Sequence, residues 1–192
     1  MSRYFFSLSS LVLFLGIIAM SCSKSDPKPL GAQTNAVFLA GDKGKSKSWK
    51  LREFGYQAPG ATTLTTQTLQ GCFMDNLYTF TNNDAQAYAS TEGTSKCFTS
   101  DPDAVESGTW AFTLDGLVLN IEADNSQTPN GLFSGEIYVE RDVNGVITNV
   151  YNGGYTPYPA FVQKIDANNL ILEINATRGT SKYKYVLTFT PS

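Results

Sequence analysis

The stretch "GTWAFTLDGLVLNIEA" at residues 108–123 decides the fold class of this chain. Every second residue is apolar in the run before Asp115-Gly116, and the same alternation resumes after it. Alternation with a period of two is typical of a strand that buries one face. Asp-Gly between two such runs is a strong hairpin signal, because both turn positions favour positive φ. We therefore predict two antiparallel strands joined by a tight turn at Asp115-Gly116.

The same pattern continues along the rest of the chain. "LYTF" (77–80) and "QAYAST" (86–91) form one predicted hairpin, and turn residues at 142–145, 166–169 and 177–181 separate later strands. Near Glu53 the alternation slips, which predicts a bulge or a bend. About ten strands follow Val37, with no convincing amphipathic helix.

These features predict an all-β domain. The favoured architecture is an antiparallel up-and-down meander that closes into a barrel of about 8–10 strands. A two-sheet β-sandwich is the alternative, because strand order alone does not separate the two. Closure removes exposed strand edges and therefore favours the barrel. The predicted core comprises Trp49, Leu51, Tyr78, Phe80, Trp110, Phe112, Leu114, Leu119, Ile121, Leu172, Ile174, Leu187 and Phe189.

The N-terminus has the pattern of an export signal. Residues 11–20, "LVLFLGIIAM", form an apolar run that fits a signal-peptide core and is short for a membrane span. The following Ala19-Met20-Ser21-Cys22 resembles the lipobox of bacterial lipoproteins. That resemblance implies that diacylglycerol is joined to the Cys22 thiol and that the chain is cut before this residue. The alternative is an ordinary secretory signal in which Cys22 is incidental.

The expected organisation is therefore a signal peptide at 1–21, the lipidated Cys22 and a flexible tether at 22–36, and a single β domain at 37–192. The tether is rich in Ser, Lys, Pro and Gly, a composition that buries little apolar surface. Ser23 after the cysteine resembles lipoproteins sorted to an outer membrane. We expect the outer membrane of a Gram-negative bacterium, with the periplasmic and cell-surface sides both left open.

Two cysteines remain once Cys22 is assigned to lipid. Cys72 and Cys97 form an even pair in an exported chain, where an oxidising compartment favours a disulfide. Closing a loop of about 25 residues stabilises the fold by roughly 3 kcal/mol in the chain-entropy model. Two free thiols are the alternative. Metal binding is disfavoured, because the chain contains no histidine and no Cys-x-x-Cys.

A succession of tryptophan, cysteine, aromatic and glycine positions runs through residues 47–121: Trp49, Cys72, Tyr78, Phe80, Cys97, Gly108, Trp110 and Asp115-Gly116. This succession resembles the bacterial lipocalin-like domain found on many lipid-anchored exported proteins. The resemblance implies an antiparallel lipocalin-like barrel and brings no established activity.

The sequence offers little catalytic chemistry. The absence of histidine removes the Ser-His-Asp and Cys-His arrangements. "DPDAVE" supplies Asp101, Asp103 and Glu106, which are weak candidates for calcium ligands because the glycine and spacing of a calcium loop are missing. A solvated acidic loop is the favoured interpretation. We predict no catalytic residue, no cofactor and no enzyme activity.

Aromatic residues in a Gly- and Pro-rich segment at 151–161 are the candidate ligand-binding residues. Tyr151, Tyr155, Tyr158 and Phe161 are expected on a loop, where rings supply contact area with a polar tip. The alternative is that these rings cap the end of the core.

The expected function is non-catalytic binding of a small apolar or glycan-like ligand, or of a protein partner, by a membrane-anchored barrel. Large rings in the predicted core favour a filled interior, which moves binding to the rim. A structural or assembly lipoprotein without a ligand is the alternative, and a carboxylate-dependent hydrolase comes third. With a formal net charge of −3 and no basic stripe, nucleic acid is not an expected partner. The oligomeric state is left open.

Overall fold

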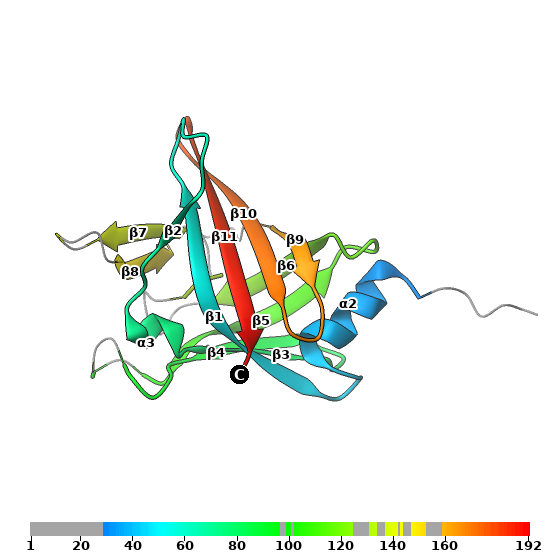
Figure 1. The fold of residues 1–192 in the computed structure, drawn as a ribbon. Coiled ribbons are helices and arrows are strands. Elements are labelled where there is room, and N and C mark those ends of the chain that lie inside the picture. The colour runs from blue at the N-terminus through cyan, green and yellow to red at the C-terminus, as the bar shows by residue number, and fades with distance from the viewer. Residues whose placement is uncertain are drawn as a thin grey trace, which may run out of the picture.

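The computed structural model confirms the predicted barrel. Eight antiparallel strands form a closed sheet, because the first long strand pairs with the last (Figure 1). Because the first and last barrel strands pair with each other, no barrel strand has an unpaired edge. The two sheets of a β-sandwich would each keep such edges. The structure describes residues 29–96, 99–100, 102–124, 131–133, 137–141, 143, 147–152 and 159–192.

The order of elements follows the chain almost without crossovers. β2 (Thr65–Gln67) is an extra strand beside β1, whereas β7 (Ile137–Arg141) and β8 (Ile147–Asn152) form a separate two-stranded sheet. Two helices, α2 (Gly31–Ala40) and α3 (Gly71–Met74), complete the described elements. The barrel strands are β1 (Ser46–Gln57), β3 (Leu77–Thr81), β4 (Ala87–Thr91), β5 (Ala104–Phe112), β6 (Val118–Asp124), β9 (Ala160–Ile165), β10 (Leu170–Arg178) and β11 (Ser181–Pro191).

The strand registers confirm the predicted hairpins and the predicted bulge. The β3–β4, β7–β8, β9–β10 and β10–β11 pairs are all antiparallel neighbours. In the β1–β11 pair the register shifts between Leu51 and Glu53, where the apolar alternation slips in the sequence. An extra residue on one strand bends it and increases its twist, which helps a long strand to follow a closed barrel.

The turn between β5 and β6 is longer than predicted. Thr113 N–H donates to the carbonyl oxygen of Val118 at 2.9 Å, so residues 114–117 form the loop rather than Asp115-Gly116 alone. Gly116 has a φ of 77°, as predicted, but Asp115 does not have the positive φ that the Asp-Gly signal favours at both positions. The longer loop carries Leu114 out of the strand, and its side chain is 76% exposed instead of buried in the core.

The rest of the predicted core is correct with one partial exception. Phe112 is half-buried and packs against the core, and the other eleven residues are buried. The interior is dominated by rings: Tyr78 lies edge-on to Phe189 with centroids 5.3 Å apart, and Phe80 lies edge-on to Trp110 at 6.3 Å. Such contacts add specific geometry to the burial of large apolar surfaces.

Helix α2 is not indicated by the sequence pattern, and it begins within the segment expected to be a tether. Its last residues, Leu39 and Ala40, are fully buried against the barrel. The indole N–H of Trp49 donates to the carbonyl oxygen of Leu39 at 2.8 Å. Lys47 Nζ lies 4.0 Å from the centre of the Trp49 ring and donates to the carbonyl oxygen of Phe38 at 3.0 Å. The helix is therefore held by tertiary contacts rather than by a strong apolar stripe of its own.

Candidate functional site

A buried carboxylate lies inside the barrel at Glu106. Its side chain is 2% exposed and accepts a hydrogen bond of 2.6 Å from the phenol of Tyr88. The backbone N–H of Leu132 donates to Glu106 Oε1 at 3.1 Å, and the backbone N–H of Phe133 donates to Glu106 Oε2 at 3.1 Å. Burying a charged group costs desolvation free energy, and three hydrogen-bond donors to one carboxylate offset part of that cost.

The segment 131–133 fills the barrel above this carboxylate. Leu132 and Phe133 are 3% and 5% exposed. The ring of Phe133 lies edge-on to Tyr88 at 5.7 Å and stacks on Phe189 at 6.4 Å. The segment follows β6 in the chain, so a connection between strands supplies part of the core. In the described part of the molecule, side chains occupy the interior position that a ligand takes in a hollow barrel.

Two buried tyrosines that interact with Glu106, Tyr78 and Tyr88, have raised pKa values. Burial raises the pKa of Tyr78 well above its usual range, and the charges of Glu106 and Glu92 raise it further. Burial likewise raises the pKa of Tyr88, with the charge and the hydrogen bond of Glu106 adding to the effect. Both phenols therefore stay protonated at neutral pH, and Tyr88 acts as a hydrogen-bond donor.

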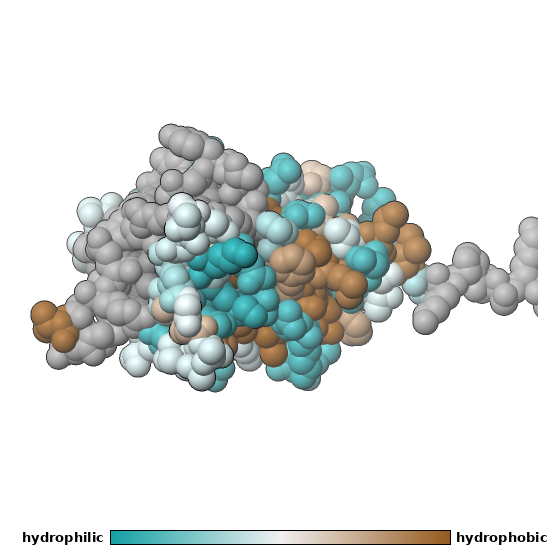
Figure 2. All heavy atoms as spheres, turned by 90° about the horizontal axis from the view of Figure 1, so that it is seen from above, coloured by the Kyte–Doolittle hydropathy of each residue, from teal (hydrophilic) through white to brown (hydrophobic). Residues whose placement is uncertain are grey.

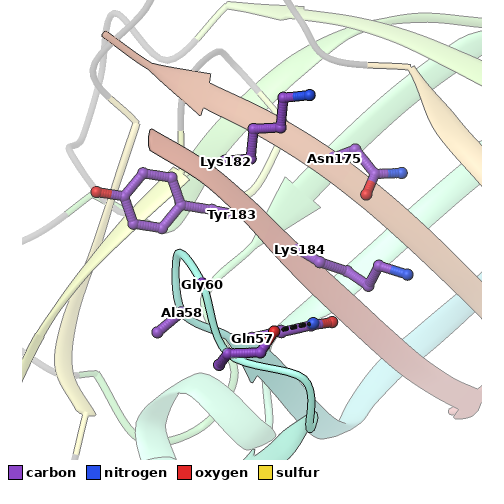
Figure 3. Close-up of a pocket in the computed structure, with 8 residues that line it drawn as sticks. Gln57, Ala58, Gly60, Asn175, Lys182, Tyr183 and Lys184 are labelled. Carbon is purple, nitrogen blue, oxygen red and sulfur yellow. Dashed lines mark hydrogen bonds between the residues drawn. The ribbon is translucent and has the colours of Figure 1, made fainter. Parts of the chain in front are cut away.

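The outer surface carries a pocket of about 240 Å³ at the end of β1 (Figure 3). The loop after β1 forms one wall and the β10–β11 hairpin forms the other. Figure 3 shows Lys182 and Lys184 on one side of β11 and the ring of Tyr183 on the opposite side, as strand alternation requires. The full lining is Gln57, Ala58, Gly60, Ala61, Asn175, Lys182, Tyr183 and Lys184.

The polar groups of this pocket are partly preorganised. Gln57 Nε2 donates to the carbonyl oxygen of Ala61 at 2.6 Å, which closes the loop on itself. Lys184 Nζ lies 3.2 Å from Glu173 Oε1, and Asn175 Nδ2 donates to the same oxygen at 3.0 Å. The ring of Tyr183 stacks on Tyr56 at 6.4 Å. The pocket thus presents the Lys182 ammonium group and side-chain amides on one side of β11, whereas Lys184 is paired with Glu173 and the Tyr183 ring lies on the opposite side of the strand.

The two described acidic candidates from "DPDAVE", Asp103 and Glu106, lie in different surroundings. Glu106 is inside the barrel, so the expectation of a solvated acidic loop is wrong for this residue. Asp103 has an exposed side chain and forms an ion pair with Lys96 at 2.6 Å. Asp101 lies outside the described residues. Within the described part of the chain, no group of three Cys, Asp or Glu side chains is placed to hold a metal ion.

Strand alternation would have identified Glu106 as a core residue. Glu106, Gly108 and Trp110 share the inward face of β5, so extending the Trp110 alternation backward predicts its burial. Gly108 has a separate reason for its position. A side chain there would clash with the backbone carbonyl of Glu122 on β6, so the two strands approach where only glycine fits.

The candidate ring residues are only partly described. Phe161 lies on strand β9 with 40% exposure, rather than on a loop. Tyr151 lies in β8, and its side chain is outside the described part of the structure. Tyr155 and Tyr158 are outside the described residues altogether.

The predicted lipid and disulfide positions also stay predictions. Cys22 and Cys97 lie outside the described residues. Cys72 lies in α3 and is 8% exposed. Of the described helices, none is long and apolar enough to cross a bilayer.

Comparison with known proteins adds no family. No protein-family model matches the chain, and no curated protein matches it significantly. The fold and the site geometry therefore carry the functional argument.

Proposed function

We propose that this chain is an exported, lipid-anchored, lipocalin-like protein that binds a small polar ligand of glycan type on its surface and performs no chemistry on it. The filled interior is the observation that carries the proposal. Trp49, Trp110, Tyr88 and Phe189 are each at most 2% exposed inside the barrel. Together with Phe133 they occupy the space in which an apolar ligand would otherwise lie, so binding moves to the outside of the wall.

The pocket beside β11 fits a sugar better than a purely apolar molecule. The Tyr183 ring offers an apolar face with a polar tip, which suits the face of a sugar ring. Gln57 and Asn175 carry amide groups that hydrogen-bond to hydroxyls, and Lys182 attracts an acidic substituent, while Lys184 is already paired with Glu173. An acidic sugar fits the amide groups and the Lys182 ammonium group.

A titration of the purified protein with D-glucuronate, followed by NMR, tests the ligand class. We expect shift changes at Asn175 and Lys182–Lys184 that saturate, and weaker changes with neutral N-acetylglucosamine. Lys182→Ala should weaken the interaction several-fold, by roughly 1 kcal/mol, because one charged donor is lost. Lys43→Ala is the matched control, since Lys43 is an exposed lysine in the turn that follows α2. Equal effects of both variants would contradict the site.

The proposed anchor has its own test. Cys22→Ala should release the protein from the membrane fraction, because two or three acyl chains hold a protein to a bilayer far more firmly than none. Persistence of the variant in that fraction after an alkaline wash that removes non-covalently bound protein would contradict lipidation at Cys22 without affecting the ligand titration.

A structural lipoprotein with no ligand is the second candidate, and the same filled interior favours it. The two candidate functions predict different NMR results for the residues that line the pocket. If neither acidic nor neutral sugars shift any resonance of its lining, the structural role replaces the binding role.

A further inference from the structure

Four exposed apolar side chains lie on the α2 side of the barrel and form what we call the apolar patch: Leu30, Val37, Leu114 and Leu117. Their exposed fractions are 50%, 46%, 76% and 61%. Leu30 immediately precedes α2 and Val37 lies within it, so the helix carries one of these side chains and begins directly after the other. Figure 2 shows apolar residues gathered where α2 lies in Figure 1.

The patch is held as one surface by contacts between α2 and the β5–β6 turn. Ala32 N–H donates to the carbonyl oxygen of Leu114 at 3.3 Å, and Asn35 Nδ2 donates to the carbonyl oxygen of Gly116 at 2.9 Å. A side chain at Gly31 would clash with the backbone of Asp115. The first turn of the helix is therefore seated directly on the turn that carries the two most exposed leucines.

Neighbouring β9 extends this apolar surface. Val162 N–H donates to the carbonyl oxygen of Leu117 at 2.9 Å, which fixes β9 beside the turn. Phe161, which is 40% exposed, pairs with Val118 in the adjacent strand. The exposed apolar side chains thus continue from the helix across the turn and onto the barrel wall.

Leu30, the first residue of the patch, lies close in the sequence to Cys22, the expected site of the lipid anchor. Leu30 is eight positions after Cys22, and eight residues span at most about 29 Å when fully extended. A lipid attached at Cys22 therefore cannot lie farther than this from Leu30. Leu30 is thus the member of the patch nearest to Cys22 along the chain, so the tether joins the domain on the side of the patch.

The charge distribution agrees with a lipid surface. The sequence contains no charged residue from Pro29 to Gly41. Within the turn the one charged group is Asp115, whose carboxylate accepts hydrogen bonds from the Thr113 hydroxyl at 2.6 Å and from Leu117 N–H at 3.0 Å. These bonds lower the pKa of Asp115, so it stays ionised. An ionised group between the leucines limits insertion to the headgroup boundary, about 5–10 Å deep, as for other interfacial segments.

We propose that the apolar patch is a second, non-covalent membrane contact that lays the α2 side of the barrel on the bilayer surface. The proposal rests on the lipid anchor of the proposed function. It gives the domain a fixed orientation, with α2 against lipid and the sheet formed by β7 and β8 on the opposite side (Figure 1). A barrel attached through its anchor alone would instead take all orientations.

The test uses the full chain, purified with its lipid and placed in vesicles of phosphatidylethanolamine and phosphatidylglycerol with brominated acyl chains. Leu114→Trp puts a fluorescent ring in the patch, and Val143→Trp puts one at a fully exposed site between β7 and β8 as the control. The native Trp49 and Trp110 are buried and give the baseline. Flotation of the vesicles reports the anchor separately from the fluorescence.

We expect both variants to float with the vesicles and the bromine quenching of Leu114→Trp to exceed that of Val143→Trp at least about threefold, since only an interfacial ring contacts acyl chains. Adding Leu117→Glu and Val37→Glu should abolish the difference while flotation persists, with circular dichroism confirming the fold. Flotation with equal quenching at both sites would overturn the membrane contact and leave the anchor standing. Loss of flotation in the unchanged protein would overturn the anchor, and this proposal with it.

Discussion

The phenol of Tyr88 donates a 2.6 Å hydrogen bond to Glu106, and both side chains are buried inside the barrel. This pair joins two neighbouring strands, because Tyr88 belongs to β4 and Glu106 to β5. The same carboxylate accepts the backbone N–H groups of Leu132 and Phe133, so it also fixes the segment that fills the interior. The Glu106 carboxylate therefore links two barrel strands to the segment 131–133 inside the barrel.

Removing this carboxylate should destabilise the domain strongly. Glu106→Ala leaves a phenol and two backbone N–H groups unpaired in the interior, and we expect a loss of about 3–5 kcal/mol in the free energy of unfolding. Glu106→Gln retains an acceptor oxygen and should lose about 1–2 kcal/mol. Urea unfolding measures both. The control Glu122→Ala changes an exposed glutamate on β6 and should stay within about 0.5 kcal/mol. A Glu106→Ala loss as small as the control's would mean that the carboxylate does not hold the segment.

Alkaline pH should destabilise the fold through Tyr78 and Tyr88. Burial raises the pKa of both phenols, so the folded state keeps protons that the unfolded chain releases near its ordinary pKa of about 10. Their contribution is therefore fully present below about pH 10 and is lost as the pH rises above that value, by up to about 1.4 kcal/mol per pH unit and tyrosine. Urea unfolding at several alkaline pH values measures the slope. Tyr78→Phe should reduce it, and an unchanged slope would contradict the burial of this phenol.

Two helix-initial glycines make a matched pair for testing the contact between α2 and the β5–β6 turn. At Gly31 a side chain would clash with the backbone of Asp115, whereas at Gly71 nothing lies within 4 Å. Gly31→Ala should therefore cost about 1–3 kcal/mol, as overpacking does. Gly71→Ala should be neutral or should stabilise by about 0.5 kcal/mol, because it restricts the unfolded chain. Thermal unfolding compares them, and equal effects would mean that α2 does not rest on the turn.

Trp49 should control the docking of α2. Trp49→Phe removes the indole N–H that pairs with the carbonyl oxygen of Leu39, which leaves a buried acceptor unsatisfied and should cost about 2–3 kcal/mol. Amide hydrogen exchange should accelerate within α2 specifically. Trp110→Phe is the control, because Trp110 donates to Thr81 on β3 and not to the helix. Acceleration of α2 in both variants would indicate global rather than local loosening.

The cysteine pair remains a prediction with a direct measurement. If Cys72 and Cys97 are joined, mass analysis of unreduced protein should show no free thiol at either position. Reduction should then lower the free energy of unfolding by roughly 3 kcal/mol, from the entropy of a loop of about 25 residues. Two alkylated thiols in unreduced protein would refute the pairing.

Local sequence determined the strands, because the period-two pattern and the turn residues act within a few positions of each other. The hairpins around residues 82–86 and 166–169 and the bulge near Glu53 follow from that short-range signal. The predicted turn at Asp115-Gly116 lies at the expected position, but the loop is longer than the predicted two residues. Hydrogen bonding between Thr113 and Val118 decides the loop, and Leu114 is exposed as a result.

The tertiary structure alone decided which of these locally similar residues become core, surface or site. Pairing of β1 with β11 closes the barrel from opposite ends of the domain, and no local pattern contains that contact. The inward position of Glu106 follows from the alternation of β5, but only the fold brings the backbone N–H groups of Leu132 and Phe133 to its carboxylate. Helix α2 has a weak pattern of its own and exists because Trp49 and the β5–β6 turn hold it. The pocket joins Gln57 to Lys184 across the closing pair. Burial and hydrogen bonding are properties of the assembled chain, so their outcome depends on partners far away in the sequence.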